Sequence, residues 1–540
     1  MRYIFTLLLS VFCFQVLIGQ PIKKEVQRPK LVVGIVIDQM RWDFLYRYAN
    51  RYSSNGFNRF LNEGFNCENT FIPYAQTVTA AGHASIYTGS VPAIHGIMGN
   101  EWYDKTLGKL VYCTEDENVK IIGAENALPQ SPRNLWASSI CDELKLATNF
   151  RSKVIGISLK DRGGILPAGH AANAAYWYDS KSGNWISSTY YMQELPLWVN
   201  RFNARKMTDS LYKSNWNTLY PISSYIQSDN DDVKYEGKYA HETKPVFPHE
   251  LSSQIGKNYG LISVTPFGNT ISLSFAKAAI ENEQMGKDSV TDFIAISLSS
   301  PDYIGHQFGP NSIEIEDTYL RLDRDLASFF SHLDAKIGKG NYTTFLSADH
   351  GVAHIPEYLS NHKIAALSLT SLTTEIANAV EAKFKIKNSI LSTANYQIYL
   401  NDNLIDSVGV EKAAVKEFII NKLNKNSNTL IAFDTDEISE VNLPSTVKEM
   451  FINGFNTKLG GDIQVVLKPS YFNGWVTGTT HGSWYNYDSH IPLLWYGWGI
   501  KKGKSNSKYY MNDIAPTLAA LLHIQMPNGA TGNVITEVLK

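Results

Sequence analysis

Apolar runs rich in β-branched residues, each ending in polar residues, are the feature that most constrains how this chain can fold. Segments with the apolar spacing of helices lie between these runs, including residues 131–147 and 315–338. Such alternation is typical of a mostly parallel sheet with helices on both faces, so an α/β fold is predicted. The runs are residues 31–43, 153–164, 292–302, 342–351 and 491–499.

Two regions interrupt this alternation and are predicted to be insertions over the strand edge. Residues 176 to about 262 are rich in Trp, Tyr, Ser and Asn. Residues 363 to about 470 have helix and strand patterns of their own. The second region is therefore expected to form a small α+β cap.

The composition excludes one class of partner. With 540 residues and 44% hydrophobic content, the chain can bury a large core, in one elaborate α/β domain or in several domains. The formal net charge of −2 provides no basic field for nucleic acid. No nucleic-acid partner is expected, and an anionic substrate would have to be attracted locally.

The N-terminal stretch "MRYIFTLLLSVFCFQVLIGQ" has one early arginine, an apolar segment and Gly19 before a charged segment. This is the layout of a secretory signal peptide. Residues 1–19 are therefore predicted to be removed, and the mature chain, residues 20–540, to be periplasmic or secreted. An uncleaved anchor is the alternative, but Ser10 and Gln15 interrupt a stretch already short for a membrane span. No stable span is expected after cleavage.

The mature chain keeps Cys67, Cys113 and Cys141, without a C-x-x-C pair. This pattern excludes a zinc ribbon and allows at most one disulfide within the chain. An oxidising compartment would favour a bridge, and buried free cysteines are the alternative. The sequence does not decide the pairing.

Polar side chains that can bind metal occur where the predicted strands end. Parallel strands deliver their carboxyl ends to one edge of the sheet, so these side chains are expected to converge there. Three carboxylates and three imidazoles suffice for two zinc ions with three protein ligands each, which leaves positions open for chemistry. Taken singly, the residues have simpler explanations, such as a helix cap, a turn or a hydrogen-bonded core imidazole. The candidates are Asp38, Asp302, His306, Asp349, His350 and His481.

A candidate nucleophile lies in "QTVTAAGHASIYTGSVPAIHG", residues 76–96. Thr79 precedes a helical segment of small residues, where its hydroxyl could cap the helix or project toward a group at the helix N-terminus. In isolation the cap is the simpler explanation. Beside two metals the threonine gains a second role, because a metal lowers the pKa of a hydroxyl.

Several motifs together resemble a known superfamily. The set "VIDQMRWD", "TVTAAGHASIYTG", "SSPDYIGH", "SADHG" and "THGSWYNYDSHIPLLWYG" is similar to the alkaline phosphatase superfamily, within its branch of nucleotide pyrophosphatases/phosphodiesterases. With "SLKDRGGILPAGH" and "SVTPFGNTISLSFAKAAI", the Thr79 stretch resembles the phosphate-irrepressible periplasmic alkaline phosphatases of bacteria. The resemblance covers nearly all of the mature chain in order. It implies an alkaline phosphatase-like catalytic domain.

The resemblance also implies roles for individual residues. Thr79 would be the nucleophile, bridging toward the second metal. Asn100 in "IMGNEWYD", and Lys160 and Arg162 in "SLKDRGG", match the phosphate-contacting residues of the monoesterase group. The implied ligand sets are Asp302, His306 and His481 for one zinc, and Asp38, Asp349 and His350 for the other. The histidines that match no ligand position are His83, His95, His354 and His490.

The implied activity is hydrolysis of small phosphate monoesters through a phosphothreonine intermediate, with release of inorganic phosphate and with two zinc ions as cofactors. A monomer is expected. Lys160 and Arg162 favour a monoester, which has one more unesterified oxygen than a diester, although in isolation they could be a solvated turn. A phosphodiesterase or nucleotide pyrophosphatase shares the metals and the threonine and stays the main alternative. A sulfatase would need a C/S-x-P-x-R context, which Cys67 lacks. An inactive binding protein of this fold would usually have lost ligands.

Overall fold

A computed structural model describes residues 26–369, 372–474 and 477–540 of the chain. The signal peptide predicted for residues 1–19 lies outside the described residues. Within the described ranges, no helix combines the length and the apolar character needed to cross a membrane.

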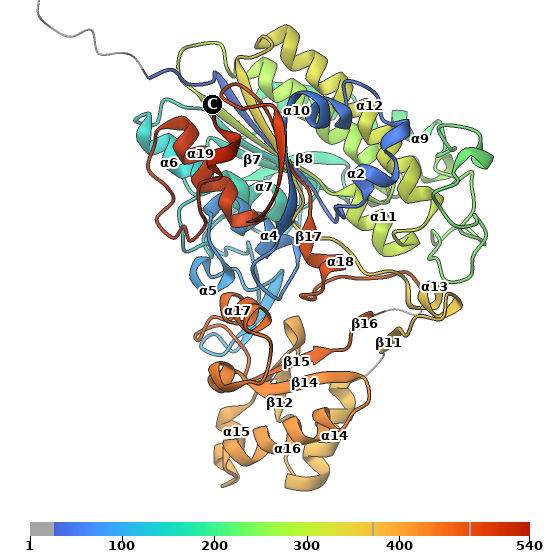
Figure 1. Cartoon of the computed structure of the whole chain (residues 1–540), viewed down its shortest axis with the longest axis vertical. Coiled ribbons are helices and arrows are strands. Elements are labelled where there is room, and N and C mark those ends of the chain that lie inside the picture. Colours follow the sequence, from blue (N-terminus) through green and yellow to red (C-terminus); the bar gives the residue numbers. More distant parts are fainter. Residues whose placement is uncertain (1–25, 370–371, 475–476) are drawn as a thin grey trace, which may run out of the picture.

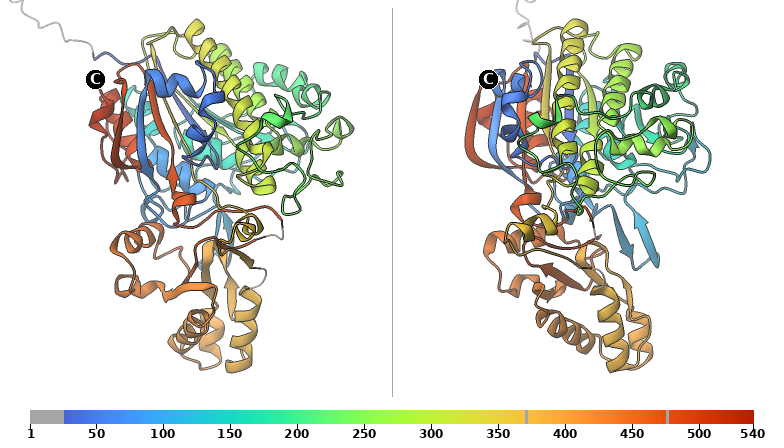
Figure 2. Two further views of the ribbon diagram at one scale, coloured as in Figure 1. Left: turned by 45° about the vertical axis from the view of Figure 1, so that its right-hand side comes forward. Right: turned by 90° about the vertical axis from the view of Figure 1, so that its right-hand side faces the viewer.

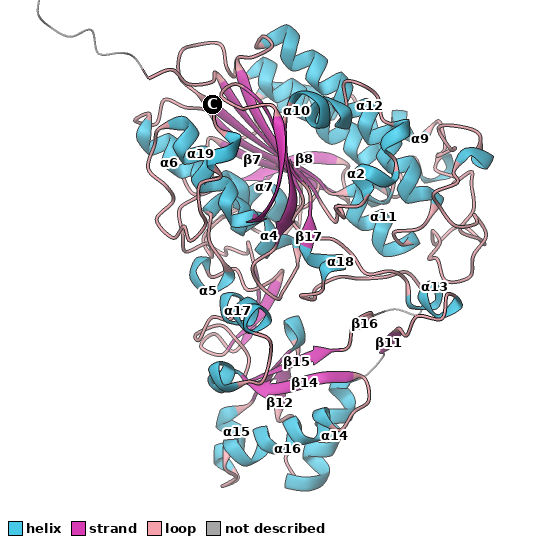
Figure 3. Cartoon of the chain, viewed as in Figure 1, coloured by secondary structure: helices cyan, strands magenta, loops and turns pink. Residues whose placement is uncertain are grey.

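The described chain folds around an eleven-stranded sheet, which Figure 3 shows between layers of helices. Five neighbouring strands at its centre run parallel to one another. Strands β1 and β9 are buried along their whole length, because helices cover both of their faces. The predicted mostly parallel α/β fold is confirmed. In spatial order the parallel strands are β10 (Tyr342–Ser347), β1 (Leu31–Ile37), β9 (Asp292–Leu298), β6 (Val154–Ser158) and β7 (Ala174–Asp179).

Antiparallel strands flank this parallel centre. Strand β18 (Leu493–Gly497), formed by the last predicted run, pairs antiparallel with β10. Its beginning therefore lies at the same edge of the sheet as the carboxyl ends of the parallel strands, and the loop before it reaches that edge. The remaining strands of the sheet are β2 (Phe65–Phe71), β17 (His490–Ile491), β19 (Gly503–Tyr510), β8 (Asn184–Ser188) and β5 (Ile121–Ile122).

Helices cover the two faces of the sheet (Figure 1). Helices α10 (Phe267–Asn282) and α12 (Ile313–Lys336) pack together on one face. Helix α4 (Thr79–Thr88), buried in all its residues, packs with α7 (Asp161–Ala168) on the other. The small residues in "TAAGHAS" let α4 lie close to its neighbours: a Cβ at Gly82 would come within 2.5 Å of the Asp349 carbonyl oxygen.

The first insertion was predicted to begin at residue 176, but the structure places that residue in the central sheet. Residue 176 lies inside β7, which pairs with β8, so the expected insertion starts within the central sheet. The aromatic residues there are buried against α10: the rings of Tyr176 and Trp185 lie 5.3 and 4.3 Å from that of Phe275. The aromatic composition thus reflects a buried sheet edge. After β8 the chain forms short helices, among them α8 (Leu197–Ala204) and α9 (Met207–Tyr212).

A second unit lies at the lower end of the molecule in Figure 1, and Figure 2 shows the same separation in two further views. It has a hydrophobic core of its own and falls within the range predicted for the cap. Its sheet has the order β12 (Ile390–Ser392), β13 (Gln397–Leu400), β15 (Ile463–Leu467) and β14 (Thr429–Asp434). Its helices include α14 (Leu372–Phe384), α16 (Lys412–Asn424) and α17 (Ser445–Gly454).

Cys67, Cys113 and Cys141 are buried and free. The single disulfide that the sequence allowed is therefore not formed among these three residues. Burial raises the pKa of each thiol, which keeps it protonated and unreactive.

Candidate metal and phosphoryl-transfer site

The six predicted ligands come together at the carboxyl edge of the parallel strands. Asp38 follows β1 directly, and Asp349 and His350 follow β10. Asp302 and His306 lie one turn apart in helix α11 (Ser300–Phe308), which begins just after β9. His481 lies in the loop before the short helix α18 (Asn486–Ser489), which leads into β17. Two groups of these side chains have ligand atoms within 4.8 Å of one another: Asp302, His306 and His481, and Asp38, Asp302 and His350.

The first group is arranged around one carboxylate oxygen. His306 Nε2 lies 3.2 Å and His481 Nε2 lies 3.4 Å from Asp302 Oδ1. The Nδ1 atoms lie 2.8 and 2.7 Å from the carbonyl oxygens of Thr479 and Thr77. A carbonyl oxygen only accepts, so in the neutral rings the proton is on Nδ1 and the lone pair is on Nε2, the form that binds metal.

The second group differs in part from the predicted set. Its carboxylates are Asp38 and Asp302, whereas Asp349 lies beside it, with Oδ2 3.5 Å from His350 Nε2. Asp349 Oδ1 accepts hydrogen bonds from the backbone N–H groups of Gln39 and His350. Asp302 therefore belongs to both groups.

The residues fit divalent cations. Asp38 Oδ1 and Asp349 Oδ2 are buried oxygens that make no hydrogen bond among the described residues, although the imidazole nitrogens of His350 and His83 lie 3.5 and 3.4 Å from them. A buried carboxylate oxygen without a partner costs about 1–3 kcal/mol or more, and a cation between these side chains would remove that cost. The donors are carboxylate oxygens and imidazole nitrogens, which zinc accepts.

Burial and mutual repulsion set the charges of the site. Burial and the nearby charges of Asp302 and Asp349 raise the pKa of Asp38 well above its usual range. Burial also opposes ionisation of Asp302, but His306 and Lys160 outweigh it and lower its pKa. Burial lowers the pKa of His350 to about 3, so its imidazole is neutral at physiological pH. Carboxylates crowded in this way favour a cation in their midst.

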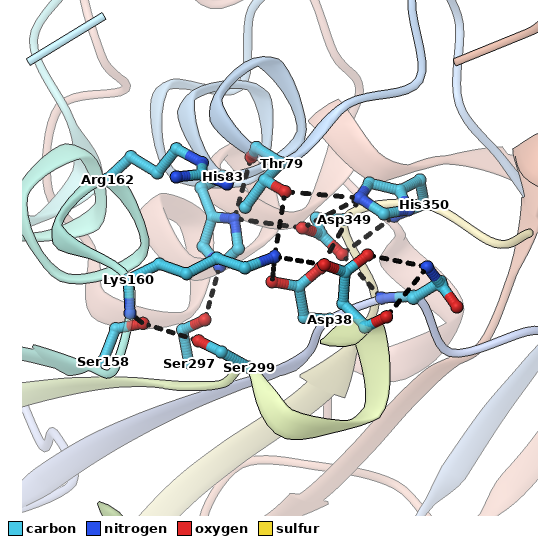
Figure 4. A network of polar contacts seen from close by, with 12 residues as sticks. Asp38, Thr79, His83, Ser158, Lys160, Arg162, Ser297, Ser299, Asp349 and His350 are labelled. Carbon is cyan, nitrogen blue, oxygen red and sulfur yellow. Dashed lines mark hydrogen bonds and ion pairs between the residues drawn. The ribbon is translucent and has the colours of Figure 1, made fainter. Parts of the chain in front are cut away.

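Lys160 supplies positive charge in the same place. Its ammonium lies 2.6 Å from Asp38 Oδ2 and 3.4 Å from Thr79 Oγ1 (Figure 4). It also lies 2.5 Å from Asp302 Oδ2. The side chain is 2% exposed, and the two carboxylates raise its pKa although burial lowers it. A residue predicted to contact phosphate thus pairs with two predicted metal ligands.

Thr79 is the first residue of α4, and Val78 is its N-cap, without a side-chain cap hydrogen bond. The Thr79 hydroxyl lies 3.5 Å from His350 Nε2 and so faces the second group of ligands. The adjacent Ala80 N–H donates to Asn100 Oδ1 at 3.0 Å. Because this oxygen accepts, the amide nitrogen of Asn100 is the end that can donate to a substrate.

Arg162 projects from the first turn of α7 toward α4 (Figure 4). Its Nη1 donates to the Tyr112 hydroxyl at 2.9 Å. Its Nε is buried and has no hydrogen-bond partner among the described residues. A guanidinium with a buried donor unsatisfied is suited to bind an anion.

The histidines that matched no ligand position have other contacts. His83 lies 2.9 Å from both the Thr79 carbonyl and Ser297 Oγ. His95 lies 2.9 Å from Ser85 Oγ, and His354 lies 3.0 Å from Arg41 Nη1. His490 is stacked on Trp42 and Phe71.

Sequence reasoning missed supporting residues. Gln39 has a left-handed backbone, with φ of 66°, and its side chain donates to Asp302 Oδ1 at 2.7 Å. Asp488 Oδ2 accepts from the backbone N–H groups of Gly482 and Ser483, which shapes the loop of His481. Gln39 could have been found by its place beside Asp38, but nothing in the sequence marks its contact with Asp302.

Comparison with known proteins places these observations in a family. The sequence matches the family model described as type I phosphodiesterase / nucleotide pyrophosphatase over residues 32–472. Alkaline phosphatase PafA of Elizabethkingia meningoseptica is 50% identical over 537 residues, covering 98% of each chain. Alkaline phosphatase PhoV of Synechococcus elongatus is 50% identical over 518 residues, covering 96% of this chain and 94% of that protein.

A protein of Myroides odoratus named calcium-transporting ATPase is 51% identical over 545 residues, covering 99% of each chain. The crystal structure of wild-type alkaline phosphatase PafA matches with a TM-score of 0.94 and 51% identity, covering 96% of this chain and 100% of that chain. The chain therefore belongs to the type I phosphodiesterase/nucleotide pyrophosphatase family, within the alkaline phosphatase superfamily.

Proposed function

We propose that this phosphoric monoester hydrolase is an exported, zinc-dependent alkaline phosphatase that acts through a phosphothreonine at Thr79. The observation that carries the proposal is the position of the Thr79 hydroxyl, 3.5 Å from His350 Nε2 and 3.4 Å from the Lys160 ammonium, beside two groups of buried carboxylates and imidazoles. Relatives with half of their residues in common are named alkaline phosphatases.

Two zinc ions are the proposed cofactors. Asp302, His306 and His481 would hold one, and Asp38, Asp349 and His350 the other, with Asp302 close to both. Bound there, zinc would lower the pKa of the nucleophile and stabilise the developing negative charge. Burial opposes protonation of His306, but Asp302 outweighs it and raises the pKa, so protons compete with metal for this imidazole more strongly than for an ordinary histidine.

The proposed reaction has two displacements at phosphorus. In the first, the Thr79 oxygen, its proton lost to solvent, bonds to phosphorus while the bond to the leaving oxygen breaks, and that oxygen takes up a proton. In the second, a water oxygen bonds to phosphorus, the bond to Thr79 breaks, and inorganic phosphate leaves. Asn100, Lys160 and Arg162 would donate hydrogen bonds to the nonbridging oxygens, on which transition-state charge accumulates.

Lys160 would change partners when substrate binds. In the structure it pairs with Asp38 and Asp302, and its ammonium is already 3.4 Å from the Thr79 oxygen that would bond to phosphorus. Cationic charge at those carboxylates would leave the ammonium available for a phosphate oxygen. A monoester dianion offers Lys160 and Arg162 one more unesterified oxygen than a diester does, which supports monoester hydrolysis over diester hydrolysis.

The name of the Myroides odoratus relative raises the question of ATP. The terminal phosphoryl group of ATP carries a single substituent and therefore presents the same unesterified oxygens as a monoester. ATP hydrolysis at Thr79 is accordingly included in the proposal. We further propose that the chain acts as a monomer on small phosphoesters after loss of residues 1–19, in the periplasm or outside the cell.

The test compares purified protein on an aryl phosphate, its methyl diester and the aryl sulfate. A clear preference for the phosphate is expected. Preference for the diester would favour the diesterase alternative, and preference for the sulfate would exclude both. Acid quenching followed by mass spectrometry should find phosphate on Thr79, whereas direct attack by water would leave none.

A further inference from the structure

The β-hairpin formed by β3 (Glu101–Asp104) and β4 (Lys109–Tyr112) begins and ends at the candidate site. Asn100 directly precedes β3, and its carbonyl accepts a hydrogen bond of 3.0 Å from the N–H of Cys113, which follows β4. The two ends of the hairpin are therefore joined. One end carries the amide proposed to contact phosphate, and the other end carries Tyr112.

The Tyr112 hydroxyl links two charged residues of α7. It donates to Asp161 Oδ1 at 2.7 Å and accepts from Arg162 Nη1 at 2.9 Å. A carboxylate can only accept and a guanidinium can only donate, so the single phenol proton must point to Asp161 and the lone pair to Arg162. The phenol hydroxyl therefore has a single orientation that satisfies both Asp161 and Arg162.

The surroundings keep the phenol neutral and in place. Burial and the Asp161 charge raise the Tyr112 pKa, so the hydroxyl keeps its proton over the working range of the enzyme. Asp161 is fixed in turn, because its Oδ2 accepts from Gln130 Nε2 at 3.3 Å. The phenol oxygen thus provides a fixed acceptor for one nitrogen of Arg162.

Arg162 has a long side chain with several rotamers, and holding it in one geometry costs conformational entropy. Binding one nitrogen to Tyr112 meets that cost before substrate arrives and leaves the buried, unpartnered Nε as a further donor. We propose that Tyr112 is a positioning residue, which holds the Arg162 guanidinium in place for a phosphate monoester through its hydroxyl. This inference rests on the phosphate-binding role proposed for Arg162.

The test measures kcat/KM for an aryl phosphate and for its methyl diester. Tyr112→Phe keeps the ring and removes only the bridging oxygen. It should lower kcat/KM for the monoester by about threefold to thirtyfold, which is less than the roughly tenfold to hundredfold of a direct hydrogen bond to a charged group, because Tyr112 acts only by positioning Arg162. The diester rate should change by less than about twofold. The matched control is Leu110→Ala, which alters an exposed side chain on the same strand and should leave both rates unchanged.

A double-mutant cycle separates positioning from a structural role. In an Arg162→Ala background, Tyr112→Phe should have little further effect, because the group that it positions is gone. If Tyr112→Phe lowers both rates equally, or lowers the monoester rate as much without Arg162, the phenol supports only the fold and the inference is wrong. If Tyr112→Phe has no effect while Arg162→Ala has a large one, the role of Tyr112 alone is overturned. If Arg162→Ala itself leaves the monoester rate unchanged, its proposed role fails, and the role of Tyr112 fails with it.

Discussion

Removing the charge of Lys160 should destabilise the metal-free protein far more than the zinc-loaded protein. The Lys160 ammonium is buried between Asp38 and Asp302, whose side chains are 0% and 4% exposed. Lys160→Met keeps most of the chain length and leaves those carboxylates without their cation. Loss of one partner from a buried ion pair costs about 3–5 kcal/mol, so the free energy of unfolding of the metal-free protein should fall by about that amount.

Zinc should cancel most of this loss, because cations bound to the same carboxylates replace the missing ammonium. By linkage, a loss that is about 3 kcal/mol smaller with zinc than without it means that the variant binds zinc about a hundredfold more tightly than the wild type. In the wild type, zinc has to displace the Lys160 ammonium from both carboxylates before it binds, and in the variant it does not.

Urea denaturation with a chelator and with zinc measures the two losses, and competition with a fluorescent zinc chelator measures affinity. The matched control is Lys145→Met, because Lys145 is also buried but contacts the Phe150 and Ser152 carbonyls and Asn173. Its effect should be the same with and without zinc. Equal destabilisation of Lys160→Met in both conditions, or weaker zinc binding, would refute the reasoning.

Three further predictions follow from the site and its surroundings. Thr79→Ala should remove most of the phosphatase activity, while Thr79→Ser should keep a substantial part, because the serine retains a hydroxyl at the same place. Equal activity of the two variants would show that Thr79 is not the nucleophile. Elemental analysis should find about two zinc ions per chain, and His306→Ala or His481→Ala should reduce the zinc content. An unchanged zinc content in these variants would contradict the ligand assignment. Burial lowers the pKa of His95 to about 3, so the unfolded chain takes up a proton near pH 6.5 where the folded chain does not. The stability that this difference contributes is complete above pH 6.5 and is lost as the pH falls toward 3. The free energy of unfolding of the wild type should therefore fall more steeply over that pH range than that of His95→Gln. Parallel profiles would show that His95 does not have a lowered pKa in the folded protein.

The order of apolar runs and polar ends along the chain was enough to predict the α/β fold and the convergence of the candidate ligands. The physical reason is that parallel strands place their carboxyl ends at one edge, so residues such as Asp38 and Asp349, each just after a run, share that edge wherever they lie in the sequence. That Asp302 and His306 lie one turn apart in helix α11 was not predicted from the sequence. His481 reaches the edge because β18 is antiparallel to β10, which its apolar pattern did not reveal.

The tertiary structure alone decided which of these side chains touch. The lateral order β10, β1, β9, β6 differs from the chain order, and it brings Asp302 into both groups of ligands and Lys160 against two carboxylates. The contact of Tyr112 with Arg162 depends on how a hairpin packs on α7, which neither local pattern records. The aromatic residues of β7 and β8 from residue 176 onward were assigned to an insertion because that region interrupts the alternation along the chain, whereas packing against α10 buries Tyr176 and Trp185 in the sheet. Local sequence determines where strands end and what they present there, but distances between residues far apart in the chain depend on strand order and packing.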